Sequence, residues 1–150
     1  MEIERKFLVH TLPSLENYPN KQMTQAYISI EPVIRIRKED DSYVLTIKSH
    51  GEIMREEHEM PITEQEFTSL LNKTEGHIIT KKRYYIPLEN DLIAELDVFE
   101  GQLTSLMTVE VEFSSLEEAN HFTPPSWFGK DVSKDYRYKN NQLALNGLPY

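Results

Sequence analysis

The chain opens with Glu2, Glu4 and Lys6 at every second position, interleaved with Ile3 and Phe7. Because successive side chains of a β-strand point to opposite faces, this spacing predicts a strand with one charged and one apolar face. Carboxylate oxygens are ligands for hard divalent cations, and an ammonium group binds anions. The residue types therefore point to a site for charged ligands.

Pairs of like charge at alternate positions return in later segments of the chain. Two like charges on one strand face repel each other, so each pair calls for a ligand of opposite charge. The cationic positions are Lys6, Arg35, Arg37, Lys48, Lys81 and Arg83, with Arg55 as a further candidate. The acidic positions are Glu2, Glu4, Glu57, Glu59, Glu95, Asp97, Glu110 and Glu112.

These two sets indicate polyphosphate chemistry. Arginine offers a planar fork that binds phosphate oxygens in a bidentate manner. Carboxylates without cysteine or a histidine motif suit Mg²⁺ or Mn²⁺. The five histidines show no HExxH spacing, and the five glycines form no GxxxxGK[ST] phosphate-binding loop. Metal, arginine and lysine in one cavity would hold a phosphate chain.

The periodicities predict the elements that position these residues. Strands are expected over residues 1–9, 22–30, 33–38, 42–48, 53–60, 78–87, 92–99 and 108–113. Thr63 with Glu66, and Ser114 with Glu117, are capping-box patterns that begin short helices, and residues 133–145 predict a last helix. About eight strands linked mostly by hairpins, with two or three helices, give a mainly β fold of the α+β class.

Composition sets further bounds. A single domain, residues 1–150, accounts for the length, and no apolar run approaches the roughly 20 residues of a membrane helix. The net charge of -9 argues against nucleic acid or an anionic membrane as a partner. The absence of cysteine and of a signal-peptide pattern at the N-terminus favours the cytoplasm.

Seven short motifs, in order, resemble those of the CYTH superfamily, the triphosphate tunnel metalloenzymes. Glu2-Ile3-Glu4-Arg5-Lys6 is similar to ExExK, Arg35-Ile36-Arg37 to RxR, and Tyr43 to Lys48 to YxLTxK. Glu57-His58-Glu59 is similar to the acidic pair, Lys81-Lys82-Arg83 to KxR, Glu95 to Gly101 to ELDxFxG, and Glu110-Val111-Glu112 to the final ExE. The resemblance covers essentially the whole chain.

The resemblance implies a closed eight-stranded antiparallel barrel around a polar tunnel, with helices packed outside. It implies metal ligands at Glu2, Glu4, Asp97, Glu110 and Glu112, with Glu57 and Glu59 beside them or at a second metal. It implies triphosphate binding by Lys6, Arg35, Arg37, Lys48, Lys81 and Arg83, to which we add Arg55 and, from the C-terminal segment, Lys134.

The expected reaction is metal-dependent transfer of a phosphoryl group from inorganic triphosphate, or a related organic triphosphate, to water. The proton acceptor is open between metal-bound water, a carboxylate such as Glu112, and a lysine; the candidate catalytic side chains are Lys6, Tyr27, Lys48 and Lys81. A class IV adenylyl cyclase and a non-catalytic triphosphate-binding module are the alternatives. The oligomeric state is open, with a homodimer among the options.

Overall fold

The structure is a computed structural model that describes all 150 residues. Its strands are β1 (Glu2–Val9), β2 (Asn20–Ser29), β3 (Val33–Glu39), β4 (Ser42–Lys48), β5 (Met54–Arg55), β6 (Glu57–Pro61), β7 (Glu75–Pro87), β8 (Ile93–Phe99), β9 (Met107–Glu112) and β10 (Phe128–Asp131). Its helices are α1 (Glu64–Leu71), α2 (Leu116–His121) and α3 (Asn140–Asn146). None of the helices is long and apolar enough to cross a membrane.

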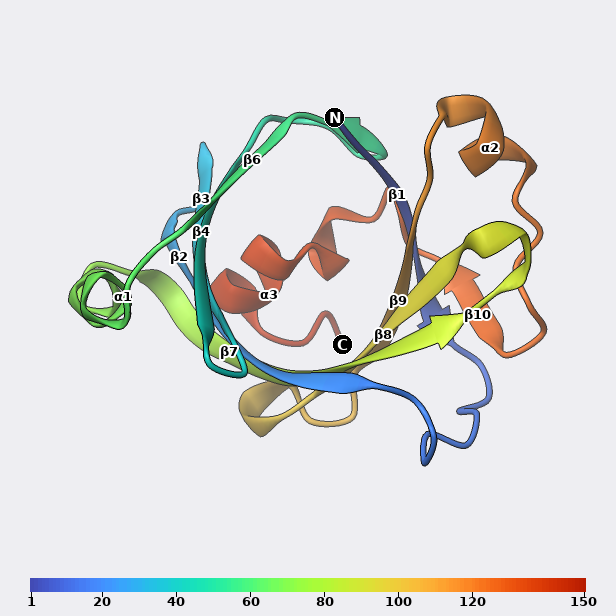
Figure 1. The fold of residues 1–150 in the computed structure, drawn as a ribbon, viewed down its shortest axis with the longest axis horizontal. Coiled ribbons are helices and arrows are strands. Elements are labelled where there is room, and N and C mark those ends of the chain that lie inside the picture. The colour runs from blue at the N-terminus through green and yellow to red at the C-terminus, as the bar shows by residue number, and fades with distance from the viewer.

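The strands form one antiparallel sheet that curls into a nearly closed barrel (Figure 1). Its order is β10-β1-β9-β8-β7-β2-β3-β4-β6, and β5 returns to pair with β1. The expected barrel is therefore confirmed, with β5 and β6 together occupying one of the eight positions and β10 added beside β1.

The strand expected over residues 53–60 is divided in the structure. Ser49 donates its backbone N–H to the Glu56 carbonyl oxygen (2.9 Å), and the Ser49 hydroxyl accepts from the Glu56 N–H (2.8 Å). These bonds hold Glu56 at the point where the chain changes partner. Before it, β5 pairs with β1, and after it, β6 pairs with β4. The short break thus closes the barrel.

Apolar side chains on one face of the strands pack on the outside of the barrel, as their alternation predicts. Ile3 and Phe7 of β1 join Val109, Val111 and Phe128 in a buried cluster beside α2. A smaller cluster lies under α1, on the other side of the barrel. Arg5 also faces outward, where it donates to the Ala119 carbonyl oxygen at 2.9 Å. The charged faces are left to the lumen.

Side-chain caps fix the beginnings of α1 and α2. The capping box of α1 is confirmed: Thr63 Oγ1 accepts from the Glu66 N–H (3.1 Å), and Glu66 Oε1 accepts from the Thr63 N–H (2.8 Å). The cap predicted for α2 at Ser114 is wrong by one residue. Phe113 still donates to the Ile3 carbonyl oxygen (2.7 Å) as part of the sheet, so the cap falls at Ser115, which accepts from the Glu118 N–H.

The C-terminal helix differs from the expectation that all helices pack outside. Viewed along the barrel, α3 lies within the ring of strands (Figure 1). Its Leu143 and Ala144 pack against Tyr27, Ile79 and Phe99, side chains that point inward from β2, β7 and β8. One end of the lumen is therefore apolar and covered by α3, and the polar part lies beyond it.

The backbone of α3 comes very close to β7 at Gly76. A Cβ atom at that position would lie 2.6 Å from the Ala144 carbonyl oxygen. Gly76 also has a φ of +74°, in the left-handed region that other residues rarely adopt. Glycine is required here on both grounds, because it lets the helix seat against the strand.

Candidate active site

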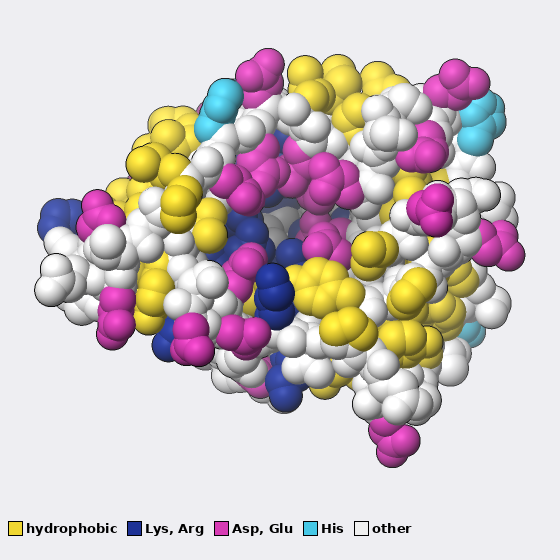
Figure 2. Space-filling view, viewed as in Figure 1, with side chains coloured by type: hydrophobic (Ala, Val, Ile, Leu, Met, Phe, Trp, Pro, Cys, Tyr) yellow, Lys and Arg dark blue, Asp and Glu magenta, His cyan; other side chains and the backbone are white.

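A cavity inside the barrel gathers most of the charged side chains singled out above. Figure 2 shows the hollow at the centre of the molecule, with acidic and basic side chains in its wall. The lining residues are Glu2, Glu4, Lys6, Tyr27, Val33, Arg35, Arg37, Lys48, Glu52, Arg55, Glu57, Arg83, Glu95, Glu110, Glu112, Val132, Ser133, Lys139, Asn140 and Asn141. Seventeen of the twenty are polar or charged, as expected of a site for ionic ligands.

The cations line the cavity from several strands. Arg35 and Arg37 project from β3, Lys48 from β4 and Arg83 from β7. Burial, and then the nearby charges of Arg35 and Arg83, lower the pKa of Arg37 to about 10. Burial and the same kind of repulsion, from Arg35 and Arg55, lower the pKa of Lys48. The cations are crowded, so an anion bound among them would relieve their repulsion.

The carboxylates come mainly from two adjacent strands. The register of β1 and β9 places Glu4 opposite Glu112 and Lys6 opposite Glu110. Burial, and then the charges of Glu110 and Glu2, raise the pKa of Glu4 well above its usual range. Burial would also raise the pKa of Glu110, but Lys6, Arg83 and Lys81 outweigh it and hold that pKa well below its usual range. The two neighbouring carboxyl groups thus have pKa values shifted in opposite directions.

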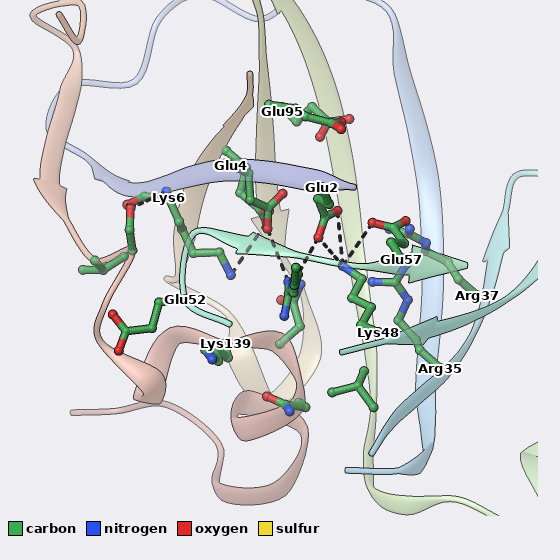
Figure 3. Close-up of a pocket in the computed structure, with 18 of the residues that line it drawn as sticks. Glu2, Glu4, Lys6, Arg35, Arg37, Lys48, Glu52, Glu57, Glu95 and Lys139 are labelled. Carbon is green, nitrogen blue, oxygen red and sulfur yellow. Dashed lines mark hydrogen bonds and ion pairs between the residues drawn. The ribbon is translucent and has the colours of Figure 1, made fainter. Parts of the chain in front are cut away.

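Ion pairs cross between the two sets (Figure 3). Glu2 Oε1 lies 3.0 Å from Arg55 Nε and 3.3 Å from Lys48 Nζ. Glu4 Oε1 lies 3.4 Å from Arg55 Nη2. Lys6 Nζ lies 3.7 Å from Glu110 Oε1 and donates to the Tyr138 carbonyl oxygen at 2.9 Å. Arg55, on the short strand that closes the barrel, thus binds both carboxylates of β1.

Asp97 and Lys81 lie behind the cavity wall and not on it. Both side chains are fully buried, with Lys81 Nζ 2.8 Å from Asp97 Oδ2. Arg83 reaches the same carboxylate through Nε (2.7 Å) and Nη2 (2.9 Å). These contacts occupy both Asp97 oxygens, which makes this side chain an anchor for Arg83. Burial, opposed by the charge of Asp97, lowers the pKa of Lys81 to about 7.

Two further predicted site residues lie outside the cavity, and two charged residues that line it were not predicted. Glu59 follows Glu57 along β6 but is exposed, and Lys134 lies outside the cavity in the turn after β10. Lys139 lines the cavity instead and donates to the Gly51 carbonyl oxygen at 3.3 Å. Strand alternation could not reveal Lys139, because it precedes α3 in a segment without strand periodicity. Glu52, in the loop before β5, also lines the cavity and was not predicted for the same reason.

The donor atoms of the lining residues are of the kind that binds a divalent metal. The lining carboxylates offer only oxygen, which Mg²⁺ and Mn²⁺ prefer. The raised pKa of Glu4, caused by burial and then by the charges of Glu110 and Glu2, marks a place where a cation would relieve repulsion between carboxylates. No three acidic or histidine side chains converge on one point, since Arg55 and Lys48 draw Glu2 aside. Binding a metal would require those ion pairs to exchange.

Comparison with known proteins places this site in a family. The sequence profile of the CYTH domain matches residues 1–138. The chain belongs to the CYTH domain family. The resemblance carried by the seven motifs is thereby confirmed. As the CYTH triphosphatases are metalloenzymes, a divalent metal is consistent with the carboxylates of this CYTH chain.

Two relatives match nearly the full length of this CYTH chain. An inorganic triphosphatase from Nitrosomonas europaea is 46% identical over 149 residues, which is 97% of each chain. An inorganic triphosphatase from Acetivibrio thermocellus is 31% identical over 153 residues, covering 99% of this chain and 95% of its own.

Solved structures give the same fold for this CYTH chain. A crystal structure of an inorganic triphosphatase superposes with a TM-score of 0.72 at 41% identity, covering 97% of this chain and 95% of that one. A putative adenylyl cyclase from Hippeastrum, described as having a dominant triphosphatase activity, superposes with a TM-score of 0.60 at 21% identity, covering 80% and 83%. At that identity the second likeness shows the fold alone.

Proposed function

We propose that this CYTH protein is a metal-dependent hydrolase of inorganic triphosphate. The observation that carries the proposal is the single cavity lined by cations from separate strands: Lys6 of β1, Arg35 and Arg37 of β3, Lys48 of β4 and Arg83 of β7. An extended anion with charge along its length satisfies such an arrangement. The two relatives that bear the name inorganic triphosphatase support the choice of substrate.

Each group of residues has a part in this reaction. The guanidinium groups of Arg35, Arg37 and Arg83 grip phosphate oxygens and stabilise the charge that builds up as the terminal phosphoryl group is transferred. Glu2, Glu4, Glu110 and Glu112 would hold Mg²⁺ or Mn²⁺. When bound, the metal supplies positive charge at the phosphate oxygens. Asp97 fixes the orientation of Arg83.

The contacts of the four candidate catalytic side chains support different roles for them in substrate binding and proton transfer. Lys6 is paired with Glu110 and Lys48 with Glu2, so both act as cations that bind the substrate. Tyr27 lines the cavity, but burial raises its pKa and keeps it a hydrogen-bond donor at neutral pH. Lys81 has a pKa of about 7, but it lies behind the cavity wall beside Asp97 and does not line the cavity.

Phosphate release from a panel of substrates tests the proposal. The panel is triphosphate, pyrophosphate, ATP and thiamine triphosphate, each with Mg²⁺, with Mn²⁺ and with a chelator. We expect metal-dependent release that is fastest with triphosphate. Cyclic AMP as the main product from ATP would instead establish a cyclase. Tight binding of triphosphate without release would establish a non-catalytic binding module.

A further inference from the structure

Gln25 is a buried polar side chain for which neither the fold nor the proposed reaction gives a role. It is fully buried, yet neither its amide nitrogen nor its amide oxygen has a hydrogen-bond partner in the protein. Buried amides are almost always hydrogen-bonded, because an unpaired donor or acceptor away from water is costly. Gln25 therefore points to a small polar ligand.

The strand register places Gln25 next to the cavity. Its side chain points inward, because its neighbour Ala26 packs in the outer cluster under α1. Gln25 is directly opposite Arg37 on β3 and two residues before Tyr27, and both of those side chains line the cavity. On the other side, Gln25 is opposite Ile79 of β7. Gln25 thus lies at the border between the charged cavity and the apolar end under α3.

The chemistry of the unpaired amide identifies the ligand as water. A phosphate oxygen accepts hydrogen bonds and could satisfy the amide nitrogen alone. A water molecule both donates and accepts hydrogen bonds. Water can therefore accept a hydrogen bond from the amide nitrogen of Gln25 and donate one to its amide oxygen. The neighbouring Tyr27, Ile79 and Phe99 form an apolar cluster, which leaves bulk solvent little access from that side.

We propose that Gln25 holds the water molecule that attacks the terminal phosphorus of the substrate. This inference rests on the proposed function. The water oxygen forms a new bond to phosphorus while the bond from that phosphorus to the bridging oxygen breaks, and the bridging oxygen leaves with the electron pair as part of diphosphate. The water proton passes to an oxygen of the phosphoryl group that is transferred, so the products are hydrogen phosphate and diphosphate.

The test replaces the amide by an apolar group of the same length. Gln25→Met should lower kcat for triphosphate by about 100-fold, the scale expected when a reacting group is misplaced by about 1 Å. The dissociation constant for triphosphate, measured by calorimetry with a chelator present, should stay within about twofold of wild type. Gln25→Asn, which keeps the amide but draws it back, should give an intermediate kcat.

A glutamine on the same strand provides the matched control. Gln22 faces outward, and its amide nitrogen already donates to the Lys81 carbonyl oxygen (3.2 Å) and to Glu100 Oε1 (2.8 Å). Gln22→Met should leave both kcat and the dissociation constant unchanged. Arg37→Ala should give the contrasting pattern of a phosphate-binding residue, with a raised dissociation constant.

Each outcome decides a separate claim. If wild-type protein hydrolyses triphosphate and both Gln25 variants keep kcat within about twofold, the inference about Gln25 is wrong and the proposed function stands. A dissociation constant that rises as much as kcat falls would mean that Gln25 binds phosphate, which also overturns it. A wild-type chain without triphosphatase activity overturns the proposed function and this inference together.

Discussion

Glu4 is a carboxyl group whose pKa is raised by burial and by its acidic neighbours. Since burial and the charges of Glu110 and Glu2 raise its folded-state pKa, the protein without metal should lose stability as the pH rises through the range between the unfolded and folded pKa values. Glu4→Gln removes this loss, so we expect a higher melting temperature at neutral pH with a chelator, by about 2 to 4 °C for each kcal/mol of relieved repulsion. Metal-dependent hydrolysis should fall by about 100-fold, since several kcal/mol of charge stabilisation depend on the metal.

The matched control for this variant is Glu59→Gln. Glu59 is exposed and outside the cavity, so neither the melting temperature nor the turnover should change. Equal loss of turnover in the two variants would show that the carboxylate wall has been assigned incorrectly.

The C-terminal segment supplies a second pair of matched residues. Lys139 lines the cavity, whereas Lys134 lies outside it. Lys139→Ala should raise KM for triphosphate by about tenfold, the equivalent of one charge-assisted contact of roughly 1.5 kcal/mol. Lys134→Ala should leave KM unchanged. Initial rates over a range of triphosphate concentrations measure both effects, and a larger effect at Lys134 would contradict the placement of this segment.

At the scale of elements, the contact between β7 and α3 can be tested through glycine. Gly76→Ala should destabilise the protein by about 1 to 2 kcal/mol for the left-handed backbone and by about 1 to 3 kcal/mol more for the clash with the Ala144 carbonyl oxygen. Gly147 has the same φ of +74°, but a methyl group added there would meet nothing within 4 Å, so Gly147→Ala should show the backbone cost alone. Urea unfolding of both variants separates the two contributions, and equal losses would mean that α3 does not seat on β7.

Strand elements were predictable from sequence because a barrel wall repeats one physical rule. Alternation placed Glu4 and Arg37 on the charged faces of their strands and Phe7 on an apolar face. The resemblance to the CYTH superfamily implied that the charged faces line a tunnel, and the structure agrees. The strand β10 was missed because its four residues, Phe128–Asp131, are too few to show a period. The break at Glu56 also left no trace in the pattern, because it depends on bonds to the distant Ser49.

The site was less predictable than the strands because alternation gives the face of a side chain but not its depth. Asp97 and Glu95 share a face of β8, yet Glu95 lines the cavity and Asp97 is sealed behind it by Arg83 and Lys81. Lys139 enters the cavity through the placement of α3 inside the barrel, which depends on packing between distant residues. Periodicity in one segment carries no information about such contacts.

For the whole molecule, the spread of cations around the cavity predicts a preference for chain length. A triphosphate can contact Lys6, Arg35 and Arg83 on three different strands, whereas a diphosphate leaves part of the set without a counter-charge. We expect kcat/KM to be at least about tenfold higher for triphosphate than for pyrophosphate, one lost contact of roughly 1.5 to 3 kcal/mol being enough. Initial rates under identical Mg²⁺ and Mn²⁺ concentrations measure the ratio, and pyrophosphate as the better substrate would refute the argument.

The two-residue pairing of β5 with β1 closes the barrel wall beside the carboxylates that would bind the metal. Arg55 of β5 binds Glu2 and Glu4, the same carboxylates that a metal would bind. A bound metal would therefore compete with the ion pairs that hold β5 against β1, a contact that we call the seam. Local opening should therefore need less free energy here than at the long β2–β7 ladder. In hydrogen-exchange experiments, the Glu4 amide, which donates to the Ile53 carbonyl oxygen at 2.9 Å, should exchange faster than the amides of β2 and should respond to added Mg²⁺. A seam that loosens as the site fills would give a triphosphate, or its products, a lateral way through the wall of a barrel that α3 covers at one end.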